Sequence, residues 1–187
     1  MRVLVACEFS GTVRNAFRAL GHDAWSCDLL PADDASPYHI QGDALEAMTG
    51  QDWDIMIAHP PCTYLTRAGW SWVNKPDSYT LPLKGEPRRM AAFAAAAFFQ
   101  RLLHAPIPRI AVENPIGCLS SRIRKPDQII QPWEYGEDAS KATCLWLKGL
   151  PLLQPTNVLP GGKKARRANQ CANGQNKLGP SPDRWKL

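Results

Sequence analysis

Short apolar runs alternate with segments of helical periodicity over most of this chain. The first run covers residues 2–7, and apolar residues at helical spacing then predict a helix over residues 12–20. Further apolar runs predict buried strands at residues 24–28, 38–41, 54–58, 109–113 and 142–147. Strands that alternate with helices favour a mostly parallel sheet with helices on both faces. The pattern therefore predicts a doubly wound α/β fold.

A long helix is predicted in the middle of the chain, after a segment without clear periodicity. Residues 88–104 are rich in alanine, and the expected core contacts of this helix are Met90, Phe93, Ala97 and Leu103. Residues 63–87 carry tryptophan, proline and glycine residues instead, and a loop of this length inside a compact domain usually has a function. A short helix is expected at 44–49, and residues 128–131 and 133–135 are expected to be extended.

Length and charge divide the chain into one domain and a basic segment. The 187 residues suffice for a single domain, which we place at residues 1–159. Residues 160–187 are irregular in pattern and carry seven basic residues and one acidic residue, whereas the rest of the chain is close to neutral. Such a segment is typical of contact with a phosphate backbone, or of a solvated tail. Its densest basic cluster is Lys163, Lys164, Arg166 and Arg167.

Several classes of protein are excluded because their patterns are missing. The six cysteines are spread singly without a Cys-x-x-Cys pair, which argues against a disulfide framework and a structural zinc site. His59 and Cys62 have metal-ligand spacing, but no second half of a site follows, so no metal is expected. No apolar run approaches the roughly 20 residues that span a bilayer, and the N-terminus reads directly as a strand rather than a signal peptide. We therefore expect a cytoplasmic protein without membrane contact.

Two reactive side chains come directly after predicted strands. Pro60-Pro61-Cys62 follows one apolar run, and Glu113-Asn114-Pro115 follows another. Taken alone, a cysteine after two prolines is most often part of a rigid turn, and a glutamate is most often a surface residue. In an open α/β sheet, however, ligands bind at the carboxyl ends of the strands. We therefore expect the Cys62 thiol and the Glu113 carboxylate to face each other across one pocket.

Acidic residues at the ends of the first three strands indicate a second ligand. The turn Glu8-Phe9-Ser10-Gly11 joins a strand to a helix and would offer backbone amides to a ligand, with glycine permitting close approach. Asp28 ends the second strand and is placed to accept hydrogen bonds from a ribose diol, while Asp43 could contact an adenine edge. Each acid taken singly is more often a surface residue or a helix cap. Together they favour an adenosine-containing ligand.

The order of these motifs resembles that of the DNA cytosine 5-methyltransferases. Roughly residues 1–150 are similar, in particular, to the small proteins of phages and prophages assigned to this family. The resemblance implies a Rossmann-like fold of the methyltransferases that use S-adenosylmethionine, with this cofactor as the adenosine-containing ligand. The residues that it implies for cofactor binding are Glu8, Phe9, Ser10, Gly11, Asp28, Asp43 and Pro60.

The resemblance also implies a covalent reaction on DNA. Carbon 5 of cytosine is a poor nucleophile, so a thiolate, here Cys62, first adds to carbon 6. Glu113 would hydrogen-bond or protonate the ring nitrogen and read the exocyclic amine. A base inside a duplex cannot reach such a site, so the implied partner is double-stranded DNA with a flipped base. The segment 63–87 is then expected to close over that base.

The chain departs from the family in its substrate-binding parts. The family carries an Arg-x-Arg pair that supports the flipped base, and the best match here is Lys141-Ala142-Thr143. A large target-recognition domain is missing. Substrate contact is therefore assigned to Asn114, Lys141 and Thr143, together with the basic cluster of residues 163–167. A protein partner that supplies target recognition is an open alternative.

Two other functions stay open. His59-Pro60-Pro61 resembles the Pro-Pro turn of amino-methyltransferases, whose carbonyls hold an exocyclic amine, although Glu113 would then have no obvious task. The lost arginine and the missing domain favour a methyltransferase-like protein that binds nucleic acid without catalysis, or acts as a decoy. Retention of both Cys62 and Glu113 favours the cytosine methyltransferase.

Overall fold

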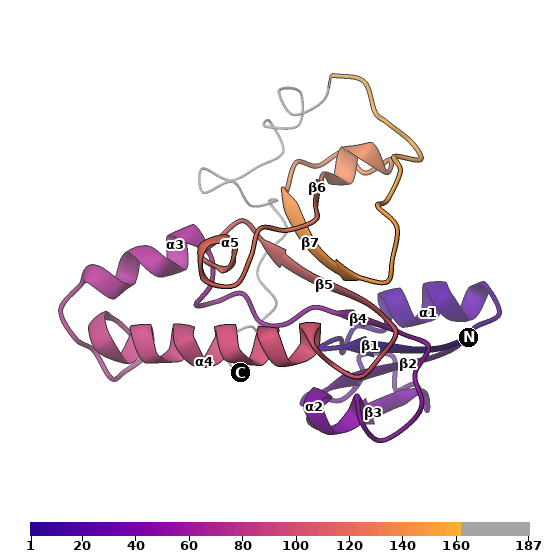
Figure 1. Ribbon diagram of the computed structural model, residues 1–187, viewed down its shortest axis with the longest axis horizontal. Coiled ribbons are helices and arrows are strands. Elements are labelled where there is room, and N and C mark those ends of the chain that lie inside the picture. Colours follow the sequence, from indigo (N-terminus) through magenta and orange to yellow (C-terminus); the bar gives the residue numbers. More distant parts are fainter. Residues whose placement is uncertain (162–187) are drawn as a thin grey trace.

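The strands of this protein form one mixed sheet, as Figure 1 shows. The computed structural model describes residues 1–161, and within them the sheet has seven strands in the order β3-β2-β1-β4-β5-β7-β6. The strands are β1 (Arg2–Ala6), β2 (Asp23–Asp28), β3 (His39–Gln41), β4 (Ile55–Ala58), β5 (Arg109–Pro115), β6 (Gln128–Ile130) and β7 (Thr143–Lys148). The five strands from β1 to β5 are parallel, and β7 runs antiparallel to both of its neighbours. The predicted α/β fold with a mostly parallel sheet is confirmed.

The strand order reverses between β1 and β4. From β1 the chain proceeds outward to β2 and β3, then returns to build β4 and β5 on the other side of β1. The carboxyl ends of β1 and β4 therefore border the switch point at which ligands bind in doubly wound sheets. Glu8 and Cys62, which sequence reasoning selected, follow these two strands.

Helices cover both faces of the sheet, as predicted. The helices are α1 (Thr12–Ala19), α2 (Ala44–Ala47), α3 (Arg67–Trp70), α4 (Gly85–Leu103) and α5 (Leu119–Arg122), with short 3₁₀ helices η1 (Ser71–Asn74) and η2 (Pro132–Glu134). On one face α1 packs Val13 and Phe17 against Val3 and Val5. The larger core lies on the other face, where α2 and α4 pack against alternate residues of β1, β4 and β5.

Helix α4 buries a different face from the one predicted. Met90, Phe93 and Ala97 are exposed, whereas Leu103 is buried as expected. The buried stripe consists of Arg88, Ala92, Ala96, Phe99, Leu102 and Leu103, and Phe99 meets the indole of Trp146 edge to face at 5.0 Å. Alanine occupies six of the seven positions 91–97 and so lies on every side of the helix, and periodicity alone therefore does not distinguish its core face. The bulky contact with Trp146 instead identifies the buried side.

Residues 63–87, predicted to be a loop, contain α3 and η1 and form a projecting unit that we call the arm (Figure 1). The arm is fixed to α4 by Arg88, whose side chain is only 5% exposed. Its guanidinium donates hydrogen bonds to the carbonyl oxygens of Thr63 (2.9 Å), Gly69 (2.5 Å) and Leu83 (3.1 Å). One side chain thus holds both ends and the middle of the arm. The extended structure expected at residues 133–135 is also wrong, because η2 begins at Pro132.

Candidate active site

The motifs that contain Cys62 and Glu113 lie at the ends of neighbouring parallel strands. Ala58 of β4 pairs with Val112 of β5, so the residue that follows each of them also lies beside its neighbour. His59 Nδ1 is 3.5 Å from Glu113 Oε2. One residue further along, the Asn114 side-chain amide donates a 2.9 Å hydrogen bond to the Pro60 carbonyl oxygen. The structure therefore brings the two predicted motifs together.

The turns beyond the two strands are also joined. The peptide nitrogens of Leu65 and Thr66 donate to the Cys62 carbonyl oxygen at 3.0 and 3.2 Å, which closes a tight turn after the two prolines. Cys118 then donates its peptide N–H to the Leu65 carbonyl oxygen at 2.8 Å, and Thr66 and Gly117 form a bridge. At Gly117 a Cβ atom would collide with the Leu65 carbonyl. The Cys62 turn is thereby fixed to the segment that follows Glu113.

Four of the cysteine thiols in the described part of the chain have a raised pKa because they are buried. Burial raises the pKa of the Cys7, Cys118 and Cys144 thiols, and it raises the pKa of Cys27 to about 12. Nearby carboxylates contribute less, with Asp28 acting on Cys7 and Cys27. These four thiols stay protonated near neutral pH and are therefore poor nucleophiles. Cys62 is half-buried and lies in the turn at the end of β4.

Glu8 supports the first helix. It is 6% exposed, and its two carboxylate oxygens accept the peptide N–H groups of Val13 (2.6 Å) and Arg14 (3.2 Å). A carboxylate at the N-terminus of a helix satisfies amides that have no intrahelical partner and interacts favourably with the helix dipole. Those two amides of α1 are therefore bound within the protein. Glu8 thus shapes the turn that contains Phe9, Ser10 and Gly11.

Position 11 requires glycine because of its backbone conformation and because a side chain would not fit there. Its φ of 70° lies in the left-handed region that favours glycine. A Cβ atom there would also collide with the Arg14 guanidinium, which crosses directly over it. Arg14 is fully buried and donates to the Ser26 hydroxyl at 2.8 Å and to the Asp34 carboxylate. The turn after β1 is thereby tied to β2 and to the loop that follows β2.

The predicted acids Asp28 and Asp43 gather around Cys7. Asp28 is 7% exposed and accepts the Leu30 peptide N–H at 3.0 Å, while Asp43 accepts the Leu45 N–H at 2.8 Å and so caps α2. Burial is the main cause of the raised pKa of Cys7, and the negative charges of Asp28 and Asp43 raise it further. All three residues therefore lie near one another at the ends of β1 to β3. Cys7 has a φ of 59°, an uncommon conformation for a residue other than glycine. Strained backbone of this kind is often found at ligand sites.

The predicted substrate-binding residues fall into two groups. Thr143 begins β7 and pairs with Pro115, so it lies beside the Glu113-Asn114-Pro115 motif. Lys141 is exposed two residues earlier, and its carbonyl accepts a hydrogen bond from the Thr143 hydroxyl at 3.2 Å. The remaining residues, Lys163, Lys164, Arg166 and Arg167, lie outside the described residues.

Two polar atoms at the strand ends are buried without a hydrogen-bond partner among residues 1–161. They are Nε2 of His59 and Oδ1 of Asn114, and Asn114 is only 1% exposed. Buried polar atoms are normally satisfied by protein, water or a ligand. The sequence did not predict the approach of His59 to Glu113, nor the role of Arg88 in this region. The signal for His59 was the alignment of two parallel strands, whereas the sequence held no signal for Arg88.

The first third of the chain is acidic. Residues 1–62 carry three basic and nine acidic residues, a net charge of −6.

Within residues 1–161, no group of three or more His, Cys, Asp or Glu side chains is arranged to hold a metal ion. No helix of the same part of the chain has the length and apolarity needed to cross a membrane.

Comparisons with known proteins support the fold. No family model and no curated protein matches this chain. Among solved structures, the chain is similar to an E. coli protein described as a predicted DNA modification methyltransferase encoded within a prophage, with 16% sequence identity and a TM-score of 0.52. The match covers 86% of this chain and 52% of that one, so this chain spans about half its length. The protein thus has a Rossmann-like, methyltransferase-like fold.

Proposed function

We propose that this protein transfers a methyl group from S-adenosylmethionine to carbon 5 of cytosine in DNA. Cys62 is the nucleophile in this proposal, and Glu113 assists it. The observation that carries the proposal is the junction of the two motifs at the ends of β4 and β5, in a methyltransferase-like fold. A nucleophilic thiol and a carboxylate beside it are the two side chains that this reaction needs.

The ends of β1 to β3 fit S-adenosylmethionine in charge and in hydrogen-bonding groups. The sulfonium and ammonium groups of this molecule are positive, and residues 1–62, which include these strand ends, have a net charge of −6. Asp28 would accept hydrogen bonds from the ribose, and Asp43 would lie near the adenine. The turn Phe9-Ser10-Gly11, shaped by Glu8, would line the site together with Pro60. When bound, this cofactor supplies an electrophilic methyl group.

The chemistry on the base begins at Cys62. Its thiolate forms a bond to carbon 6 of cytosine, and the electron pair of the carbon 5–carbon 6 double bond moves onto carbon 5, which can then accept a methyl group. Glu113 hydrogen-bonds or protonates the ring nitrogen, which stabilises the negative charge that the addition creates. Loss of the carbon 5 proton to solvent and release of the Cys62 thiolate restore the double bond.

The acceptor in this proposal is duplex DNA with one base rotated out of the stack. Asn114 and Thr143 lie on the strands that border the junction, and Lys141 lies just before β7. The arm follows Cys62 directly, and in this proposal it covers the base. The basic residues Lys163, Lys164, Arg166 and Arg167 would contact phosphates, and a protein partner would supply further target recognition.

The proposal is tested by trapping the covalent intermediate. The protein is incubated with labelled S-adenosylmethionine and duplex DNA that contains 5-fluorocytosine, because fluorine at carbon 5 blocks release of the enzyme. A protein–DNA adduct is expected with the unmodified protein and with Cys118→Ala, which removes a neighbouring half-buried thiol. No adduct is expected with Cys62→Ala.

Two other outcomes would overturn the proposal. Methyl transfer that survives Cys62→Ala would assign the methyl group to an exocyclic amine instead. In that case the Pro60 carbonyl, which already accepts the Asn114 amide, would also have to receive the amine. Cofactor binding without transfer to any DNA would indicate a protein that binds nucleic acid without catalysis.

A further inference from the structure

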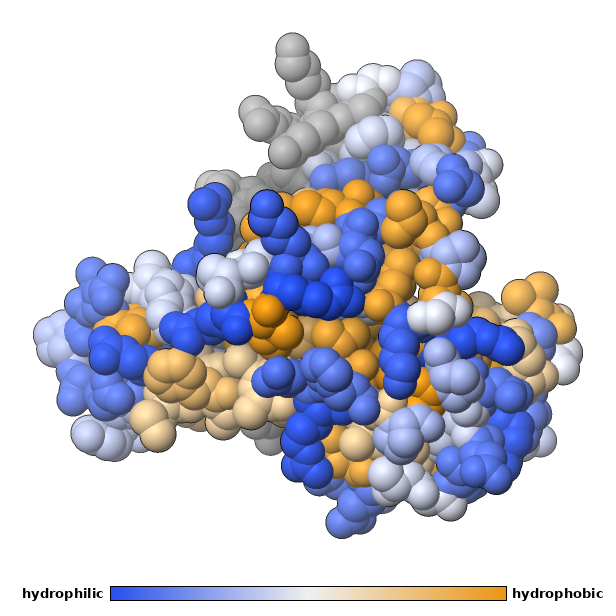
Figure 2. Space-filling view, viewed as in Figure 1, coloured by the Kyte–Doolittle hydropathy of each residue, from blue (hydrophilic) through white to orange (hydrophobic). Residues whose placement is uncertain are grey.

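The middle of the chain is as basic as the first third is acidic. Residues 63–125 carry ten basic and three acidic residues, a net charge of +7, against −6 for residues 1–62. Charge asymmetry of this size between parts of one chain is typical of proteins that bind nucleic acid. Most of these basic residues lie on the arm, on the first turns of α4 and on α5. Figure 2 shows hydrophilic side chains gathered over α5 and the segment after it.

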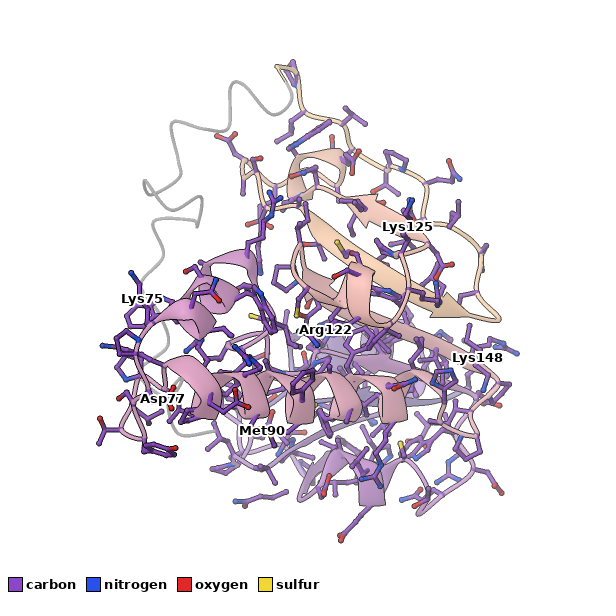
Figure 3. The ribbon with its side chains drawn as sticks, turned by 60° about the vertical axis from the view of Figure 1, so that its left-hand side comes forward. Lys75, Asp77, Met90, Arg122, Lys125 and Lys148 are labelled. Atoms are coloured by element: carbon purple, nitrogen blue, oxygen red, sulfur yellow. The ribbon has the colours of Figure 1, made fainter. Side chains whose placement is uncertain are left out.

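Aromatic side chains of the arm hold several of these cations in place. The Arg122 guanidinium lies 4.2 Å from the ring centre of Trp70 and 4.6 Å from that of Phe93, so it is stacked between the arm and α4 (Figure 3). The Lys84 ammonium lies 5.4 Å from the ring centre of Trp72. Cations held on aromatic rings lose little further conformational freedom when they bind an anion.

This basic face begins at the proposed active site. Helix α5 starts one residue after Cys118, whose peptide nitrogen is bonded to Leu65 in the turn that follows Cys62. Arg67, exposed at the start of α3, follows the same turn. Lys75 and Arg89 extend the exposed charge along the arm and α4, and Arg89 forms a surface ion pair with Glu86 at 3.0 Å. Both α5 and the arm therefore start from the turns that border the proposed site.

We propose that the arm and α5 bind the phosphate backbone of duplex DNA, through Arg67, Lys75, Lys84, Arg89 and Arg122. This inference rests on the proposed function, and it identifies the surface that holds the DNA beside Cys62. Phosphates are attracted to basic side chains interleaved with aromatic rings. Residues 1–62 have a net charge of −6, which disfavours contact with DNA and favours the arm side of the site.

The experiment compares two pairs of arginines in the full chain. Binding of a fluorescent DNA duplex is measured by anisotropy at several salt concentrations for Arg67→Gln/Arg89→Gln and for the control Arg101→Gln/Arg109→Gln. All four arginines are exposed, but Arg101 lies in the last turn of α4 and Arg109 begins β5, away from the site. Loss of two phosphate contacts is expected to reduce the slope of log affinity against log salt by up to about 1.8. The control variant should keep the slope of the unmodified protein.

An unchanged slope in the arm variant, or an equal loss in both variants, would overturn the inference. The inference would also be overturned if Arg67→Gln/Arg89→Gln lost more affinity for an RNA duplex of equal length than for the DNA duplex. Methyl transfer to the same duplex is measured in parallel, because the two proposals fail differently. Weaker DNA binding by the arm variant, without methyl transfer by any of the proteins, would support the surface and contradict the proposed activity. Methyl transfer together with unaltered DNA binding by the arm variant would support the proposed activity and contradict the proposed DNA-binding surface.

Discussion

His59 Nδ1 lies 3.5 Å from Glu113 Oε2, across the junction of strands β4 and β5. The contact follows from the parallel register, which places the residue after Ala58 beside the residue after Val112. Both side chains are partly exposed, at 31% for His59 and 21% for Glu113. With a proton on Nδ1, the imidazole would hold one carboxylate oxygen and leave the other oxygen of Glu113 for the base. His59 is thus placed to orient Glu113.

The orienting role of His59 predicts a specific pattern of kinetic effects. His59→Leu removes the polar neighbour of Glu113, and the rate of adduct formation with 5-fluorocytosine DNA should fall on the order of tenfold to a hundredfold. His59→Asn can donate from nearly the position of Nδ1 and should recover most of that rate. DNA affinity should stay unchanged in both variants. Equal rates in the Leu and Asn variants would contradict an orienting role.

The close approach of the two turns predicts the effect of one methyl group. Gly117→Ala places a Cβ against the Leu65 carbonyl, which must shift and carry the Cys62 turn with it. We expect a loss of about 1–3 kcal/mol in the free energy of unfolding, measured with denaturant, and a large loss of adduct formation. Gly42→Ala is the control, because nothing lies within 4 Å of its added Cβ. Normal adduct formation by Gly117→Ala would show that the turns need not be held together.

The arm is expected to depend on Arg88. Arg88→Met keeps an unbranched apolar stem but leaves three carbonyl oxygens without the guanidinium donor, and should lower the free energy of unfolding by about 2–4 kcal/mol. The neighbouring Arg89→Met removes only a surface ion pair and should change it by less than about 1 kcal/mol. Protease cleavage between residues 63 and 87 should accelerate in Arg88→Met and not in Arg89→Met. Equal stability of the two variants would contradict the anchoring role.

Much of this architecture could be predicted from the sequence, because strand ends have strong local signals. The apolar run before Pro60 and the run before Glu113 are both short and bounded by proline, and the structure places both motifs at one junction. The orientation of α4 could not be predicted, because alanine makes several of its faces equally apolar. The anchoring by Arg88 could not be predicted either, because its carbonyl partners are up to 25 residues away in the chain. Tertiary contacts decide such features, and local pattern does not encode them.

The buried thiol of Cys27 predicts how stability changes with pH. Burial, assisted by the charges of Asp28 and Asp43, raises its pKa to about 12, whereas an unfolded thiol has a pKa of about 8.5. The folded protein therefore keeps a proton that the unfolded chain loses. The stabilising contribution is complete below about pH 8.5 and decreases as the pH rises from there toward 12, by about 1.4 kcal/mol per pH unit.

Cys27→Ala isolates this effect. Urea unfolding at pH 7 and at pH 10 should show a smaller loss of stability on raising the pH in the variant than in the unmodified protein. The variant is less stable at both values, because it leaves a small cavity beside the core. The difference between the two pH values is therefore the informative quantity. An identical pH dependence in the two proteins would contradict this prediction. It would mean that burial and the two carboxylates do not raise the pKa of Cys27 in the folded protein.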